Sequence, residues 1–437
     1  MVEATITNQH ETIACMCYLN GGTRIMDLII RQARLRSQPG TWDIGINGDR
    51  IAITAEHIEE AGTQEVDAAG NLVAPTYVNG HIHLDKCHLQ ERMLPNKNYS
   101  FAECLELTWE HKAHYTVEDI LERAGRAIEE GILNGATVFR AFADVDTIGK
   151  LRPLEGLLAL RERWRNIVHI EVVAFPQEGL IRDPGADLLM EEAMRMGAGV
   201  VGGLPWFEML DEDARAHIDW CFELAKKYDK DIHMLVDDTD NPMSRSLEYL
   251  AVKTMREGYH GRVSASHCGA LAAYDEVHAR KIMDLVKEAN VSISTNPHIS
   301  LVVQGRFDLE PIRRGITRVK QLWHLGVNVF SSQDDVADPF YPFGRNDQQE
   351  VAAYVCHAAH MTARDEIEAA FDFVTNNAAR ALRLEGYGLQ PGCRADLNVL
   401  TASTVQQVLR IQQPPRWVIR SGRILARNQL QRELSRL

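Results

Sequence analysis

The feature that most constrains the fold of this chain is an alternation of strand-like and helix-like segments between about residues 76 and 385. Apolar runs typical of buried strands are separated by segments with helical spacing of apolar residues, such as 117–135 and 211–228. Eight strands that alternate with helices predict a (β/α)8 (TIM) barrel of the α/β class. The eight runs are residues 72–84, 136–145, 169–177, 199–207, 231–238, 262–269, 291–298 and 327–335.

The two ends of the chain have a different pattern. Short strand-like segments separated by turns, such as RIMDLIIRQARL and DIGINGDRIAIT, precede the alternation, and RWVIRSGRILA resumes the pattern after it. We therefore expect a small β-sandwich domain built from residues 1–75 and 386–437, with the catalytic barrel at 76–385 inserted between them.

Composition excludes several classes of protein. The formal net charge of −14 argues against binding to nucleic acid or to an anionic membrane. No apolar run reaches the roughly 18 residues of a membrane-spanning helix, and the polar first 17 residues do not resemble a secretory signal. The eight cysteines include no CxxC pair, so we expect reduced thiols and a cytoplasmic protein.

A cluster of metal-ligand residue types falls near the predicted strand ends. His81 and His83 share one face of a strand, because side chains two residues apart in a strand point the same way. His233, His267 and Asp334 fall on the fifth, sixth and eighth predicted strands. Imidazoles with a carboxylate suit a divalent metal that keeps one position open for water. Such a metal lowers the pKa of water towards neutrality and makes hydroxide available for attack, and Asp334 can also accept the proton.

Several motifs carry a resemblance to a known family. HIHLDK (81–86), SASH (264–267) and SSQDDV (331–336) resemble the amidohydrolase superfamily. Other motifs are similar to the cytosine deaminase group of that superfamily, with N-isopropylammelide isopropylaminohydrolase as a more distant relative. These other motifs are VVAFPQEGL (172–180), LPWFE (204–208), SRSLEYLA (244–251), the stretch 296–322 and DDVADPFYPFG (334–344).

The resemblance implies roles for individual residues. The metal ligands would be His81, His83, His233 and Asp334, while His267 would polarise the substrate or intermediate and Gln177 would bind the edge of the ring. Members with two metals carry a carboxylated lysine after the fourth strand, and no lysine stands there in this sequence. We therefore expect one metal ion per chain, with zinc preferred and iron or manganese as alternatives. The resemblance also implies a homo-oligomer that acts on a small heterocyclic molecule.

The sequence departs from the resembling family at one important position. Cytosine deaminases have a glutamate three residues after the histidine of the fifth strand, and it shuttles a proton to the ring and the leaving amine. Val236 occupies that spacing here, and Asp237 and Asp238 follow it. We expect Asp237 to take over as the catalytic acid–base because it shares strand parity with His233, with Asp238 as the fallback.

Four further residues near strand ends are candidates for substrate binding. Trp206 and Phe340 either sandwich a flat ring or belong to the barrel core. His298 is a loop histidine that we include as a candidate, and Asp335 is expected to orient the metal site or a loop.

Three functions remain open from the sequence. The first is metal-dependent hydrolysis of a C–N bond in a pyrimidine, triazine or related cyclic amidine, with release of ammonia or an amine. The second is hydrolysis of a cyclic amide or lactam, in which Asp334 would be the only acid–base. The third is a barrel without catalytic activity, which the presence of all the expected ligand residues argues against.

Overall fold

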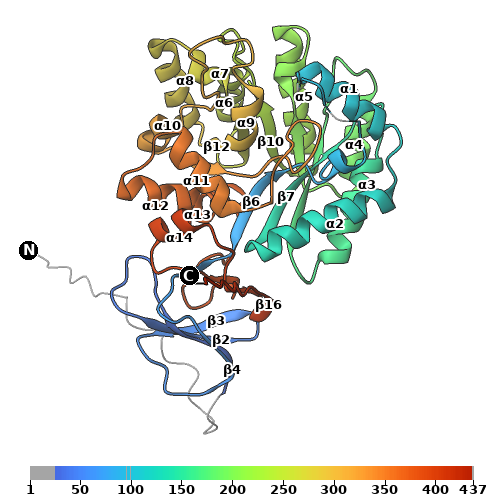
Figure 1. Cartoon of the computed structure of the whole chain (residues 1–437). Coiled ribbons are helices and arrows are strands. Elements are labelled where there is room, and N and C mark those ends of the chain that lie inside the picture. The colour runs from blue at the N-terminus through green and yellow to red at the C-terminus, as the bar shows by residue number, and fades with distance from the viewer. Residues whose placement is uncertain (1–24, 95, 99, 436–437) are drawn as a thin grey trace, which may run out of the picture.

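The computed structural model describes residues 25–94, 96–98 and 100–435. Within these residues, eight strands form one sheet in which each strand pairs in parallel with the next along the chain (Figure 1). This arrangement confirms the predicted (β/α)8 barrel. Its strands are β6 (Tyr77–Ile82), β7 (Ala136–Asp144), β8 (His169–Phe175), β9 (Val200–Gly203), β10 (Asp231–Val236), β11 (Val263–His267), β12 (Ser292–Thr295) and β13 (Val329–Ser331).

The barrel closes where β6 meets the residues that follow β13. An isolated parallel bridge joins Ile82 to Asp334. The N–H of Asp334 donates to the carbonyl of His81 at 2.9 Å, and the N–H of His83 donates to the carbonyl of Asp334 at 3.0 Å. Two of the predicted metal ligands, His81 on β6 and His83 just after it, are thereby joined through the backbone to a third.

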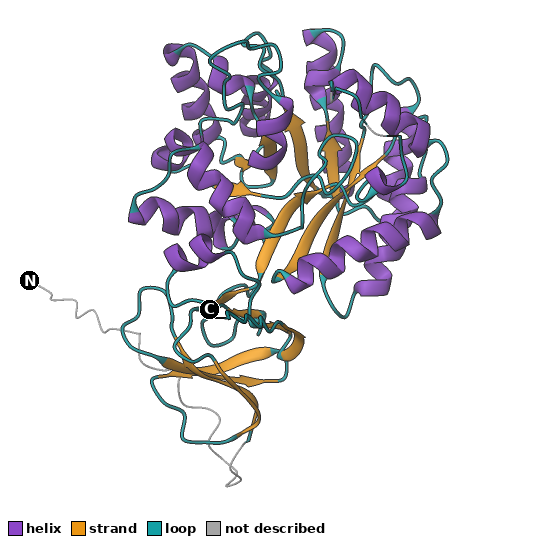
Figure 2. Ribbon diagram, in the orientation of Figure 1, coloured by secondary structure: helices purple, strands orange, loops and turns teal. Residues whose placement is uncertain are grey.

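Helices surround the barrel (Figure 2). Helix α2 illustrates why they form, because Thr116 caps its first turn and Ile120, Ala124, Ala127 and Ile128 form a buried stripe at helical spacing. The helices are α1 (Phe101–Lys112), α2 (Val117–Leu133), α3 (Arg152–Trp164), α4 (Ala186–Met196), α5 (Asp211–Tyr228), α6 (Ser246–Arg256), α7 (Ala270–Ala273), α8 (Glu276–Glu288), α9 (Pro297–Val303), α10 (Val319–Leu325), α11 (Gln348–Ala358), α12 (Arg364–Phe373), α13 (Asn376–Ala381) and α14 (Val405–Ile411), with 3-10 turns η1 (Leu89–Glu91) and η2 (Pro205–Phe207). Among the described helices, none has the length and apolar character needed to cross a membrane.

The chain ends form a separate β-structure below the barrel in Figure 1. The described residues there form two four-stranded sheets, in the orders β3-β2-β1-β4 and β16-β15-β14-β5. Ile30, Ile44, Val73 and Leu397 belong to their common apolar core. Residues 1–24, which we assigned to this domain, lie outside the described residues. The strands are β1 (Met26–Ala33), β2 (Trp42–Asn47), β3 (Arg50–Ala55), β4 (Gly62–Asp67), β5 (Val73–Pro75), β14 (Leu397–Val399), β15 (Trp417–Arg420) and β16 (Arg423–Arg427).

One detail of the sequence prediction is corrected. The first apolar run, residues 72–84, is two strands, because β5 pairs antiparallel with β14 in the small domain and β6 pairs with β7 in the barrel. Thr76 lies between them, and its N–H donates to the carbonyl of Asp396.

Tight packing between β8 and β9 gives a test of the barrel. A Cβ on Gly202 would lie 2.5 Å from the carbonyl oxygen of Ala174, a backbone atom that cannot rotate away. We predict that Gly202→Ala lowers the free energy of unfolding by about 1–3 kcal/mol, the range for an overpacked core. Gly125→Ala is the control, because a Cβ there meets no heavy atom within 4 Å and alanine favours the helix. Equal thermal midpoints for the two variants would contradict this packing.

Candidate active site

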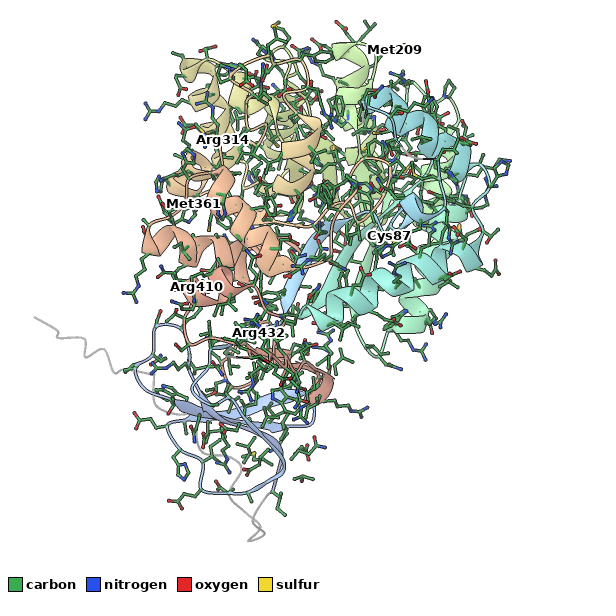
Figure 3. All side chains as sticks on the ribbon, viewed as in Figure 1. Cys87, Met209, Arg314, Met361, Arg410 and Arg432 are labelled. Carbon is green, nitrogen blue, oxygen red and sulfur yellow. The ribbon has the colours of Figure 1, made fainter. Side chains whose placement is uncertain are left out.

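A cavity of about 500 Å³ opens at the carboxyl ends of the barrel strands. Strand β6 starts beside the small domain, so these carboxyl ends face away from it, on the side where Met209 and Arg314 are labelled in Figure 3. In TIM barrels this is the face that carries catalysis. The polar residues that line the cavity are His83, Lys86, Gln177, Asp238, Thr239, Asp240, Asn241, His267, Gln304, Arg306, Asp308, Arg313, Asp334 and Asp335.

Three side chains converge at the closure of the barrel. The Nε2 atoms of His81 and His83 lie 3.3 Å apart, and Oδ1 of Asp334 lies 3.2 Å from the first and 3.5 Å from the second. Burial lowers the pKa of His81, and burial together with the Lys86 ammonium holds the pKa of His83 well below its usual range. Burial alone would raise the pKa of Asp334, but His81 and His267 lower it. Neutral imidazoles beside an ionised carboxylate are the donor set that a divalent cation requires, so these residues fit a metal site.

His233 lies beside this group without joining it. Its ring centroid is 5.2 Å from that of His81, but its Nε2 lies 2.6 Å from Oγ of Ser266, which also lies 2.8 Å from Nδ1 of His81. On its other side, Nδ1 is 3.4 Å from a guanidinium nitrogen of Arg140. Among the described residues, the triads whose ligand atoms lie within 4.8 Å of one another include His81, His267 and Asp334, and also His83, Asp334 and Asp335.

His267 faces the other oxygen of the Asp334 carboxylate. Its Nε2 lies 3.3 Å from Oδ2 of Asp334, whereas His81 and His83 approach Oδ1. The amide of Asn296 donates to the same Oδ2 at 3.0 Å. The two carboxylate oxygens of Asp334 therefore face different histidines, and Asn296 is a neighbour of Asp334 that the sequence interpretation missed.

The two aspartates after β10 occupy different environments, and our order of preference was wrong. Asp237 does not line the cavity: its carboxylate accepts from the backbone N–H groups of Ser246 and Leu247, both at 2.9 Å, at the start of α6. Strand parity failed because β10 ends at Val236 and Asp237 has a left-handed backbone with φ 48°. Asp238 lines the cavity instead, with Oδ1 3.5 Å from Nδ1 of His267, and burial raises the pKa of Asp238.

Gln177 lies on the cavity wall beside a residue that the sequence interpretation did not single out. The ammonium of Lys86 is 3.4 Å from Oε1 of Gln177, 3.1 Å from Nδ1 of His83 and 2.8 Å from Oδ1 of Asp144. Lys86 is the last residue of the HIHLDK motif, so its position in the motif was the available signal.

The remaining candidates divide between cavity and core. Trp206 and Phe340 line the cavity together with Phe101, whose ring centroid is 5.7 Å from that of Trp206 and 6.0 Å from that of Phe340. Asp335 also lines the cavity, and burial with the nearby Asp338 holds the pKa of Asp335 well above its usual range. The prediction for His298 is wrong in position: this residue is absent from the cavity lining and packs 4.3 Å from the ring of Tyr354.

Comparison with known proteins identifies the family. Residues 107–426 match the model described as "Amidohydrolase family". The structure of 5-methylcytosine deaminase from Klebsiella pneumoniae has a TM-score of 0.89 and 33% identity to this chain, and the similarity covers 93% of this chain and 100% of that one. This chain belongs to the amidohydrolase family.

Two curated relatives agree with this assignment. N-isopropylammelide isopropyl amidohydrolase from Pseudomonas sp. (strain ADP) is 29% identical over 409 residues, which are 92% of this chain and 98% of that protein. Pterin deaminase from Rhizobium rhizogenes (strain K84) is 29% identical over 372 residues, 83% of each chain. The protein is therefore an enzyme that hydrolyses C–N bonds, and it has residue groups able to hold a metal.

The geometry around Asp334 predicts which histidines bind the metal. We expect purified protein to contain about one divalent ion per chain, and we expect His81→Ala and Asp334→Ala to lose both the ion and the activity. His267→Asn should keep the ion and lose about 10²-fold or more in kcat, the range for one positioned acid–base or electrostatic group. Elemental analysis measures the metal content of each variant. Loss of the ion from His267→Asn would show that His267 is a metal ligand.

The contrast between the two aspartates gives a matched pair of variants. Asp238→Asn should lower kcat by roughly 10²–10⁴-fold with the metal retained, the range for a lost general acid–base. Asp237→Asn should leave kcat near normal and lower the thermal midpoint, because loss of a helix-capping group costs about 1 kcal/mol. The reverse pattern of rates would restore Asp237 as the acid–base.

Proposed function

We propose that this enzyme hydrolyses an exocyclic C–N bond of a nitrogen heterocycle, such as an amino-substituted pyrimidine or triazine, and releases ammonia or an amine. The observation that carries the proposal is the position of Asp238. It provides the cavity with a second acid–base carboxyl group beside His267, separate from Asp334. An unprotonated amine is a poor leaving group, so its release from an amidine needs a side chain that can donate a proton to it.

The lining of the cavity supports a flat, partly polar substrate. The aromatic side chains of Trp206, Phe340 and Phe101 offer faces for a ring, and Gln177 offers an amide for its polar edge. All three relatives reported above carry the names of nitrogen heterocycles, namely cytosine, ammelide and pterin derivatives. This agreement supports the substrate class and leaves the individual compound open to the assay below.

The residues of this chain divide the chemistry among them. We assign one divalent ion, preferably zinc, to His81, His83 and Asp334. His233 would be the fourth ligand only if its Nε2 exchanged Oγ of Ser266, now at 2.6 Å, for the ion. When bound, such an ion supplies a nucleophile by lowering the pKa of water towards neutrality. Asp334 accepts the proton of the attacking water at its carboxylate, and His267 polarises the reacting carbon–nitrogen group from the Oδ2 side of Asp334. Asp238 protonates the ring nitrogen, takes up the hydroxyl proton of the resulting adduct and passes it to the leaving amine. The water proton held by Asp334 then restores the acid form of Asp238.

A product assay separates this function from hydrolysis of a cyclic amide. We expect ammonia or a free alkylamine from at least one compound in a panel of amino-substituted pyrimidines, alkylamino-triazines and aminopterins. Hydantoin-like and lactam rings should remain intact under the same conditions, because the proposed leaving group is an exocyclic amine protonated by Asp238 and these rings have none at the reacting carbon. A ring-opened acid as the main product, with no amine release, would favour the cyclic amide hydrolase with Asp334 as the only proton carrier.

A further inference from the structure

We infer that Gln304 is a positioning residue for Asp238, so that the segment at the cavity mouth, residues 304–315, controls the acid–base group. This inference rests on the proposed function, because that function assigns proton transfer to Asp238. Gln304 is the C-cap residue that follows α9, and it begins the irregular connection to α10. We call residues 304–315 the mouth segment.

Contacts with the loop after β10 hold the start of the mouth segment. The side-chain amide of Gln304 donates from Nε2 to Oδ1 of Asp238 at 2.7 Å. The next residue, Gly305, donates its backbone N–H to Oδ2 of Asp240 at 2.6 Å. Arg313, near the far end of the segment, lies 3.7 Å from Oδ1 of Asp240. Asp238 and Asp240 of the loop after β10 therefore bind Gln304 and Gly305, the first two residues of the mouth segment.

The bond to Gln304 determines which oxygen of Asp238 can transfer a proton. The Nε2 group of a glutamine side chain can donate but cannot accept, so Oδ1 of Asp238 remains an acceptor while the bond persists. Because the carbonyl oxygen of a carboxylic acid is a stronger acceptor than its hydroxyl oxygen, this bond favours Oδ2 as the site of the proton in the acid form. Because the bond also fixes the rotation of the carboxyl group, Gln304 sets the direction in which Asp238 donates to a leaving amine.

Gly315 holds Gln304 in this position by direct packing. A Cβ on Gly315 would lie 2.3 Å from Cβ of Gln304 and 2.8 Å from the carbonyl oxygen of Ser300. Only glycine leaves room for Gln304 at this point, and the backbone of Gly315 is also left-handed, with φ 69°. The two ends of the mouth segment therefore meet at the residue that binds Asp238.

A double-mutant cycle tests whether Gln304 acts through Asp238. Gln304→Ala should lower kcat by about 10- to 100-fold, the scale of a misplaced catalytic group, while KM changes little. In the Asp238→Asn background the same change should alter kcat by less than about twofold, because coupled residues are not additive. Losses that multiply in the double variant, or a loss confined to KM, would overturn the inference.

A pair of glycine variants tests the packing without altering either polar group. Gly315→Ala should reproduce the loss in kcat seen for Gln304→Ala. Gly326→Ala is the matched control, because its φ of 88° imposes the same backbone strain but a Cβ there meets no heavy atom within 4 Å. Equal kcat values for the two glycine variants would contradict the role of Gly315.

Hydrogen–deuterium exchange provides a measurement that does not depend on turnover. Gln304→Ala and Asp238→Ala should each speed amide exchange in the mouth segment by about threefold to tenfold, the factor for the net contribution of one hydrogen bond, with strands β6 and β7 unchanged. Unchanged exchange in both variants would overturn the inference. If the unmodified enzyme released no amine from any compound tested, the proposed function would fail, and the exchange result would still decide whether these residues are coupled.

Discussion

Two backbone hydrogen bonds at the seam of the barrel underlie both the fold and the active site. They join Asp334 to His81 and to His83, at 2.9 and 3.0 Å, and so close the ring of strands between β6 and β13. The same residues carry the side chains that converge on the metal-binding position. Asp334 has a left-handed backbone, with φ 69°, which costs energy for a residue other than glycine. The closure that compensates this cost also points its carboxylate at the two imidazoles, so the barrel cannot open at this seam without dispersing the site.

A buried network of charges supports the floor of the cavity. Asp144 accepts from Lys86 at 2.8 Å and from Lys112 at 3.1 Å, and Lys112 also donates to Asp146 at 2.6 Å and to Glu178 at 2.9 Å. Buried ions are costly unless they are paired, and here every ammonium meets carboxylates. Lys112 is the last residue of α1, whose first residue, Phe101, lines the cavity. The network thus connects the position of an aromatic wall to the residues that hold His83 and Gln177.

The sequence predicted the parts of this protein that depend on regular repetition. Each of the eight apolar runs contains one barrel strand, because strand and helix periodicity is a local property. The pair His81 and His83 was predictable for the same reason, since both belong to β6 or its immediate end. Prediction failed at Asp237, because alternation stops where β10 ends and the backbone turns, and at His298, whose partner Tyr354 comes from a distant helix. Asn296 and Ser266 lay inside the predicted runs, but only the closed barrel brings them against Asp334 and His233.

The strand order of the second sheet in the small domain has a consequence for biosynthesis. Strand β5, at residues 73–75, pairs with β14, and β15 and β16 complete that sheet at Arg427. The last barrel strand, β13, ends at Ser331. During translation, all eight strands of the barrel therefore emerge from the ribosome before β5 has any of its sheet partners. Strand β5 therefore lacks its partner β14 until nearly the whole polypeptide has been made, and the second sheet of the small domain is the last part of the molecule that can be completed. The first sheet, β3-β2-β1-β4, lies within residues 26–67 and can form before the barrel.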